Sequence, residues 1–111
     1  MDVQLKELSL TELKQTKNLA TSDKEYNRDK HLKRRYGISA LDYDALLKAQ
    51  NSVCAICSSL NRNGNRLSVD HDHKTGKVRG LLCSKCNHGI GIFNDEVLRV
   101  KSAMEYLIKY A

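Results

Sequence analysis

Two carboxylates and two imidazoles stand in four consecutive residues, Asp70-His71-Asp72-His73. Histidine changes its charge near neutral pH, which makes a neutral imidazole a suitable general base. A hard cation such as Mg²⁺ prefers oxygen ligands, and Asp70 and the amide oxygen of Asn87 are candidate ligands of that type. These residues predict hydrolysis of a phosphodiester, with His71 activating water and a cation placed at the phosphate.

Two Cys-x-x-Cys pairs flank this stretch, and their members are Cys54, Cys57, Cys83 and Cys86. Four thiolates complete a tetrahedral shell around zinc and leave no open position, so the zinc is predicted to be structural. Such a metal ties turns together where the hydrophobic core is small. Alternatives are ligation by His71 or His73, redox pairs, and plain buried cysteines. Four cysteines suffice, however, and the βαβ pattern of thioredoxin-like redox proteins is absent.

Positioning the catalytic residues requires irregular backbone, because Asp70 and His71 face opposite sides of a regular strand. For both to serve one phosphate, the strand must end, twist or bulge at this point. The surrounding sequence predicts a strand at 67–70, a turn at 74–77 and a second strand at 78–82. Together these form an antiparallel pair.

The segment before the cysteines predicts two helices. Residues 23–36 are strongly charged, and Gly37 is placed to end the helix that they form. Ser39 is then the N-cap of a second helix over about 40–50. Asp42, three residues after Ser39, provides a carboxylate variant of the capping box.

Two further helices follow the second cysteine pair. One is predicted to begin within 87–92, and the other covers about 95–110, with Asn94 as its cap. The fold class is therefore α+β, with a small zinc-stabilised core, an N-terminal helical extension and a C-terminal helix. We assign residues 1–36 to the basic extension and residues 37–111 to the zinc-bound domain.

Lys and Arg outnumber Asp and Glu by 19 to 13, which gives a formal charge of +6. A basic surface gains free energy by releasing counterions from phosphates, so this charge favours a polyanionic partner. Charge alone does not separate nucleic acid from an anionic membrane surface. The charged segment 23–36 is either a solvated helix or an arm that tracks phosphates. The basic residues expected to contact phosphates are Lys33, Arg34, Arg35, Lys74, Lys77 and Arg79.

The chain of 111 residues suits one domain with a modest core, since it has five Tyr, one Phe and no Trp. It has no apolar run long enough for a transmembrane helix, and its N-terminus lacks the features of a signal peptide. We therefore expect a cytoplasmic protein without a membrane partner. In a reducing compartment, paired cysteines favour metal over disulfides.

A known family shares these motifs. Three of them resemble the recombination endonuclease VII family of phage, within the His-Me finger (ββα-metal, HNH-like) nucleases: Asp70-His71-Asp72-His73, the run from Gly76 to Cys83, and Cys86-Asn87. The resemblance covers about residues 34–106 and also includes Tyr36-Gly37-Ile38, the helix at 41–50 and Cys54-Ala55-Ile56-Cys57.

The resemblance implies a role for most residues of the site. The four cysteines bind a structural zinc, and His71 activates the water. Asp70 and Asn87 hold a Mg²⁺ or Mn²⁺ against the phosphate. His73 matches a family histidine beside the scissile phosphate, where it orients the phosphate or assists the leaving group. Asp72 is left without an assigned role.

The leading hypothesis is a Mg²⁺-dependent endodeoxyribonuclease that cuts duplex, nicked or branched DNA as a monomer or homodimer. Its expected setting is the host cell, as a phage-encoded or prophage-derived protein. The family's best-known member resolves branched DNA as an intertwined dimer. Here residues 87–111 follow the last cysteine, so we expect no long C-terminal dimerisation region. The alternatives are a non-catalytic zinc-stabilised module that binds nucleic acid, and a zinc-stabilised protein-interaction domain, which the basic charge does not favour.

Overall fold

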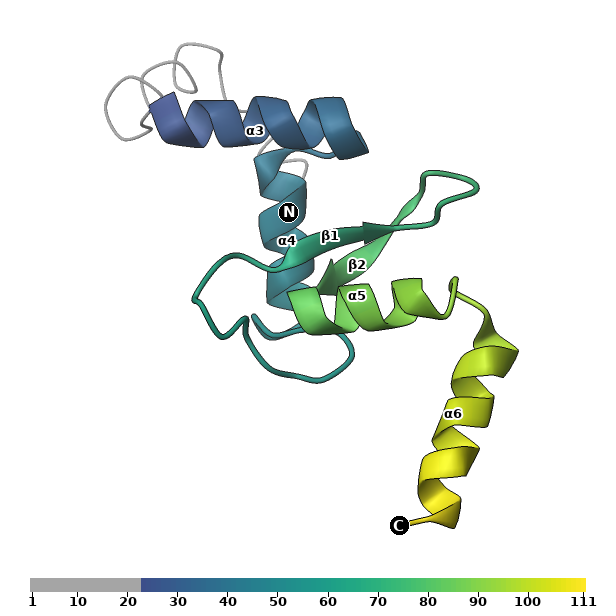
Figure 1. Cartoon of the computed structure of the whole chain (residues 1–111). Coiled ribbons are helices and arrows are strands. Elements are labelled where there is room, and N and C mark those ends of the chain that lie inside the picture. Colours follow the sequence, from purple (N-terminus) through teal and green to yellow (C-terminus); the bar gives the residue numbers. More distant parts are fainter. Residues whose placement is uncertain (1–22) are drawn as a thin grey trace. The chain divides into compact units, whose positions relative to one another are not determined.

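The computed structural model describes residues 23–111, and the predictions made for residues 1–22 lie outside the described residues. Helices and a small sheet occur together, which confirms an α+β chain (Figure 1). The chain divides into two compact units, of which the first ends at Tyr43 and the second begins at Asp44. The elements are α3 (Asp23–Tyr36), α4 (Ala40–Ala49), β1 (Ser68–His71), β2 (Val78–Leu82), α5 (Ser84–Ile92) and α6 (Val97–Lys109).

The charged helix α3 has the predicted bounds. Acidic side chains lie in its first turn and basic ones in its last, which complements the helix dipole. The Lys33 ammonium pairs with Asp29 at 3.0 Å. Gly37 follows in a left-handed conformation with φ 74°, and its N–H donates to the Lys33 carbonyl at 3.0 Å. This is the glycine helix end that the sequence predicted.

The capping box at the start of α4 is confirmed. The Ser39 N–H donates to Asp42 Oδ2 at 2.9 Å, and the Asp42 N–H donates to Ser39 Oγ at 3.0 Å. A carboxylate from α3 adds to this cap, because the Ala40 N–H donates to Asp29 Oδ1 at 2.7 Å. Asn51-Ser52, with positive φ at both residues, ends the helix where predicted.

The sheet of the second unit is the antiparallel pair β1–β2, which confirms both predicted strands and their pairing. Leu81 is fully buried, and Val69, its partner across the strands, is 7% exposed. The other buried hydrophobic side chains of this unit are Cys54, Leu67, Leu82 and Cys83. Two cysteines therefore form part of a small core, as expected where a metal supports the fold.

One side chain outside the predicted motifs ties the first cysteine turn to the sheet. Gln50 Nε2 donates to the carbonyl oxygens of Val53 and Leu81, each at 2.9 Å, and Gln50 Oε1 accepts from the Leu81 N–H at 2.9 Å. The Ala55 N–H also donates to the Leu81 carbonyl, at 3.1 Å. Gly80 passes so close that a Cβ there would lie 3.2 Å from Gln50 Oε1. The sheet has two strands within residues 23–111, and Gln50 pairs backbone groups on the edge of β2 that faces away from β1.

Gln50→Ala is expected to lower the free energy of unfolding by about 1–3 kcal/mol, because the buried Leu81 N–H loses its acceptor. Urea unfolding of the zinc-loaded protein measures this change. Lys48→Ala, at an exposed position of α4, is the control and should change stability by less than about 0.5 kcal/mol. Equal stability of the two variants would contradict the role given to Gln50.

Helix α5 begins at Ser84, so the start predicted near Asn87 was wrong. Cys83 is the N-cap, and its Sγ accepts from the Cys86 N–H at 3.4 Å. Cysteine is not among the side chains that mark an N-cap in a sequence, which explains the error. The earlier start places Cys86 and Asn87 in the first turn of a helix that contacts both strands (Figure 1).

The cap predicted for the last helix was also wrong. The N-cap of α6 is Glu96, without a side-chain hydrogen bond. Asn94 and Asp95 have φ values of 54° and 58°, and their N–H groups donate to the carbonyls of Gly91 and Ile90, which closes the end of α5. Asparagine tolerates the left-handed conformation, so it suits a helix end as well as a helix start.

Five apolar residues of α6 are exposed. They are Val97, Val100, Met104, Leu107 and Ile108, with exposures from 39% to 78%. Within residues 23–111, no helix combines the length and apolar character that crossing a bilayer requires.

Candidate functional site

The four cysteines form one cluster. Their sulfur atoms, from Cys54, Cys57, Cys83 and Cys86, all lie within 4.8 Å of one another. The Cys57 and Cys83 sulfurs are 3.7 Å apart. In a tetrahedral zinc site with Zn–S bonds of about 2.3 Å, two sulfurs lie about 3.8 Å apart. All four side chains are free thiols, and their spacing is that of a closed tetrahedral metal site.

The protonation of the cluster also suits a cation. Burial raises the pKa of the Cys54 thiol, but backbone N–H groups, first that of Cys57, outweigh burial and lower the pKa to about 6. Burial, together with hydrogen bonds to the neighbouring thiols, raises the pKa of Cys86 to about 12. Cys86 therefore stays protonated at neutral pH unless a cation balances the charge of four thiolates. The cluster fits zinc in spacing and in chemistry.

Asp70, the carboxylate predicted to bind the catalytic metal, is buried and forms a bidentate ion pair. Arg79 Nε donates to Asp70 Oδ2 at 2.7 Å, and Arg79 Nη2 donates to Oδ1 at 2.9 Å. Asp70 pairs with Gly80 and His71 pairs with Val78, so Arg79 is an extra residue on β2. A bulge of this kind re-aims a side chain, here toward Asp70. The irregularity lies between Asp70 and His71, where the sequence predicted one.

The same guanidinium reaches a second carboxylate. Arg79 Nη2 lies 3.4 Å from Asp95 Oδ2, in the loop between α5 and α6. Hydrogen bonding to Asp70, with smaller contributions from Asp95, raises the pKa of Arg79 above its ordinary value. Asp95 was not among the residues that the sequence predicted for the site. No local pattern marks it, because its partner is 16 residues away.

The two predicted histidines are brought together. Their ring centroids lie 5.1 Å apart, with 28° between the ring planes, so His71 and His73 are stacked. His71 ends β1 and is half-buried, whereas His73 is exposed in the following turn. One short segment therefore presents two imidazoles side by side.

Asp72, left without a role from the sequence, builds the turn between the strands. Its Oδ1 accepts from the N–H groups of Lys74 at 2.8 Å and Thr75 at 3.0 Å. Its N–H donates to the Lys77 carbonyl, and its own carbonyl accepts from Gly76. The Thr75 and Lys74 N–H groups lower the pKa of Asp72. Asp72 is thus a structural residue of this turn.

Asn87 lies in the first turn of α5, directly after Cys86, and its N–H donates to the Cys83 carbonyl at 3.0 Å. The oxygens of Asn87 and Asp70 are hard donors of the type that Mg²⁺ prefers. A carboxylate offers about four lone-pair sites, so Asp70 retains capacity beyond its two bonds to Arg79. The chemistry of these two donors is of the kind that a divalent cation prefers, and a guanidinium already lies at the Asp70 carboxylate.

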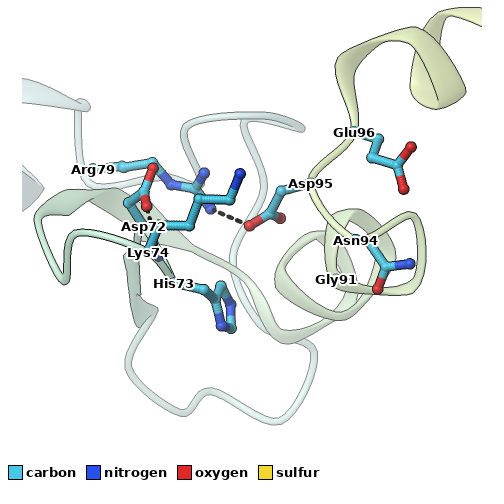
Figure 2. A pocket seen from close by; sticks show the side chains of 8 residues that line it. All are labelled: Asp72, His73, Lys74, Arg79, Gly91, Asn94, Asp95 and Glu96. Carbon is cyan, nitrogen blue, oxygen red and sulfur yellow. Dashed lines mark hydrogen bonds and ion pairs between the residues drawn. The ribbon is translucent and has the colours of Figure 1, made fainter.

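A pocket of ≈ 480 Å³ lies beside Arg79 (Figure 2). Figure 2 shows the ion pair from Arg79 to Asp95, with His73 and Lys74 from the turn after β1. The lining residues are Asp72, His73, Lys74, Arg79, Gly91, Asn94, Asp95 and Glu96. Asp70, His71 and Asn87 do not line this pocket.

The other predicted phosphate contacts lie in both units. Lys33, Arg34 and Arg35 are exposed in the last turn of α3, and Lys74 and Lys77 are exposed in the turn between the strands. Exposed side chains are available to a polyanion. Their contacts with DNA stay predictions.

The second unit is therefore a cysteine-clustered α+β module in which two strands lead directly into a helix. Residues 29–109 match the sequence profile of recombination endonuclease VII. The chain belongs to the recombination endonuclease VII family, and the resemblance inferred from the motifs is confirmed.

Two phage proteins are similar to the chain. It is 49% identical over 75 residues to the Gene 59 protein of Mycobacterium phage D29, and 47% identical over 74 residues to the Gene 59 protein of Mycobacterium phage L5. The matches cover 67% and 66% of this chain, and 46% and 45% of those proteins. The chain thus spans about half the length of the curated relatives it matches.

Proposed function

We propose that this chain is a metal-dependent DNA endonuclease of the His-Me finger type. The observation that carries the proposal is the run β1–β2–α5, with Asp70 and His71 at the bulge and Asn87 in the first helical turn. Membership of the recombination endonuclease VII family supports the same activity. Zinc in this proposal is structural, because the four cysteines close its coordination shell.

Each side chain has a distinct task in hydrolysis. His71 accepts a proton from water, whose oxygen forms a bond to phosphorus while the bond to the leaving oxygen breaks. The leaving oxygen takes its proton from solvent or from His73, whose ring stacks on that of His71. The oxygens of Asp70 and Asn87 would hold Mg²⁺ or Mn²⁺, which supplies positive charge beside the phosphate.

DNA is the proposed substrate. The formal charge of +6 favours a polyanion, and the exposed Lys74 and Lys77 directly follow the catalytic segment of β1. Lys33-Arg34-Arg35 adds a second set of basic residues in α3. Duplex, nicked and branched DNA are the substrates to compare, and the chain acts as a monomer or homodimer within the phage-infected cell.

Plasmid cleavage tests this proposal. Zinc-loaded protein is expected to nick supercoiled plasmid when Mg²⁺ is added and to leave it intact without Mg²⁺. Asn87→Ala is expected to reduce the rate on the order of 100-fold, because an oxygen ligand is lost, with the melting temperature unchanged because no zinc ligand is lost. Asn65→Ala, in the exposed loop before β1, is the matched control and should retain the full rate.

The outcome with wild-type protein separates the two classes of function. Failure to cleave plasmid, nicked or four-way DNA in either Mg²⁺ or Mn²⁺ would overturn the endonuclease proposal. Retained DNA binding in that case would support the non-catalytic zinc module. Cleavage by Asn87→Ala at the wild-type rate would remove Asn87 from the proposed site.

A further inference from the structure

The Asp70 carboxylate is already paired with a positively charged side chain. Both of its oxygens accept hydrogen bonds from Arg79, at 2.7 and 2.9 Å, and its side chain is 9% exposed. Bidentate contacts between a guanidinium and a carboxylate are among the strongest side-chain hydrogen bonds, because both partners are charged and their geometries match. The bulge on β2 makes this contact possible by placing Arg79 as an extra residue opposite Asp70.

A divalent cation and this guanidinium compete for one carboxylate. Like charges a few ångströms apart repel strongly where water is partly excluded. Metal binding at Asp70 therefore favours a position of Arg79 farther from it. The Arg79 side chain is 36% exposed, so it is not locked in place by packing on every side.

Asp95 offers that position. Its Oδ2 lies 3.4 Å from Arg79 Nη2, and both residues line the ≈ 480 Å³ pocket, which leaves room for the guanidinium to turn (Figure 2). Two other carboxylates line the pocket, but each has a partner of its own. Asp72 is bound by the backbone of its turn, and Glu96 pairs with Arg99 at 3.6 Å. Asp95 is therefore the best-placed acceptor.

We propose that Arg79 occupies the Asp70 carboxylate as a stand-in cation, that a divalent metal displaces it, and that Asp95 then receives the guanidinium. This inference rests on the metal site in the proposed function. Arg79 and Asp95 are positioning residues, since neither binds the metal. Arg79 keeps the buried Asp70 paired and aimed, and Asp95 lowers the free energy of releasing it. The exchange sets the Mg²⁺ concentration at which the site fills.

Binding of Mn²⁺ alone to the zinc-loaded protein tests the exchange without DNA or activity. Electron paramagnetic resonance of free Mn²⁺ gives the dissociation constant. Arg79→Gln is expected to tighten Mn²⁺ binding on the order of tenfold, because the competing charge is gone. Arg79→Lys keeps the charge but loses the bidentate fork, so its affinity should lie between those of Arg79→Gln and wild type. Asp95→Asn is expected to weaken binding about fivefold, because the displaced guanidinium loses its acceptor.

The double variant distinguishes the exchange from a simple charge effect. If Asp95 acts through Arg79, Asp95→Asn changes nothing further once Arg79→Gln is present. Equal weakening by Asp95→Asn in both backgrounds would overturn the proposal, as would unchanged affinity in Arg79→Gln. Thermal melts check that each variant folds. If Arg79→Gln does not fold, Arg79→Lys replaces it in the same double-mutant cycle. Asp95→Asn is then expected to weaken Mn²⁺ binding less in the Arg79→Lys background than in wild type.

Asp70→Asn separates failure of this inference from failure of the proposed function. If Asp70→Asn loses Mn²⁺ binding but the effects of Arg79→Gln and Asp95→Asn on Mn²⁺ affinity simply add, the exchange alone is overturned. Mn²⁺ binding by Asp70→Asn as tight as that of wild type would place the metal elsewhere and overturn both the exchange and the Asp70 metal site of the proposed function. We expect Asp70→Asn to lose Mn²⁺ binding, and the effects of Arg79→Gln and Asp95→Asn on Mn²⁺ affinity to be non-additive.

Discussion

Cys83→Ser is expected to release the zinc and to abolish cooperative unfolding of the second unit. Structural zinc contributes about 10–16 kcal/mol in small zinc domains. That is as large as the whole stability of a small domain, about 5–15 kcal/mol. A serine hydroxyl does not replace a thiolate as a ligand. Cys83 is also 5% exposed and caps α5, so the same substitution weakens the core and the helix start.

Metal analysis after gel filtration and a thermal melt followed by circular dichroism measure this effect. Lys85→Ala, at the exposed position between Cys83 and Cys86, is the control and should keep one zinc and the wild-type melting temperature. A chelator should bring wild type to the same unfolded state, and added zinc should restore only wild type. A Cys83→Ser protein that keeps its zinc and its melting temperature would rule out a structural role for the cluster.

A zinc ion at the cysteine cluster would also connect stability to the proposed chemistry. Asn87 directly follows Cys86 and lies in the helix that Cys83 caps. The position of Asn87 relative to β1 therefore depends on the cysteine cluster and on the contact of α5 with both strands. Removing zinc is expected to weaken the contact of α5, and so of Asn87, with the strands as well as to unfold the core.

The sequence predicted those features that depend on neighbours within a few residues. The capping box between Ser39 and Asp42 and the left-handed Gly37 are confirmed because each is a local arrangement with a definite residue preference. The bounds of β2 follow from a short apolar run between a turn and a cysteine. The gathering of the four cysteines also followed from spacing, because metal ligation requires it.

Contacts between distant segments were not predicted. Gln50 bonds to Leu81 across 31 residues, and Arg79 bonds to Asp95 across 16, so no periodicity in the sequence marks either pair. The bulge was partly predicted, because Asp70 and His71 could not otherwise share a site. Which strand carries the extra residue depends on the register of the pair, and register is a tertiary property.

His71→Ala is expected to reduce the rate of DNA cleavage by about 10²–10⁴-fold, the usual contribution of a general base. The zinc cluster and the metal donors Asp70 and Asn87 are untouched, so Mn²⁺ binding and the melting temperature should be those of wild type. His73→Ala should have a smaller effect, because solvent can replace it as the proton source for the leaving oxygen. Imidazole added to the buffer should restore part of the His71→Ala rate, since a free base then enters the vacated space.

Single-turnover cleavage of plasmid at saturating Mg²⁺ measures the chemical step directly. His88→Ala, at an exposed position of α5 outside the motif, is the matched control and should cleave at the wild-type rate. A His71→Ala rate within a few fold of the control would exclude His71 as the base. A loss in His73→Ala as large as that expected for His71→Ala, with partial rescue by imidazole only there, would assign the base to His73. Because the two rings are stacked with centroids 5.1 Å apart, His73 is the direct competitor of His71 for the role of general base. Imidazole rescue of His71→Ala and of His73→Ala decides between the two residues.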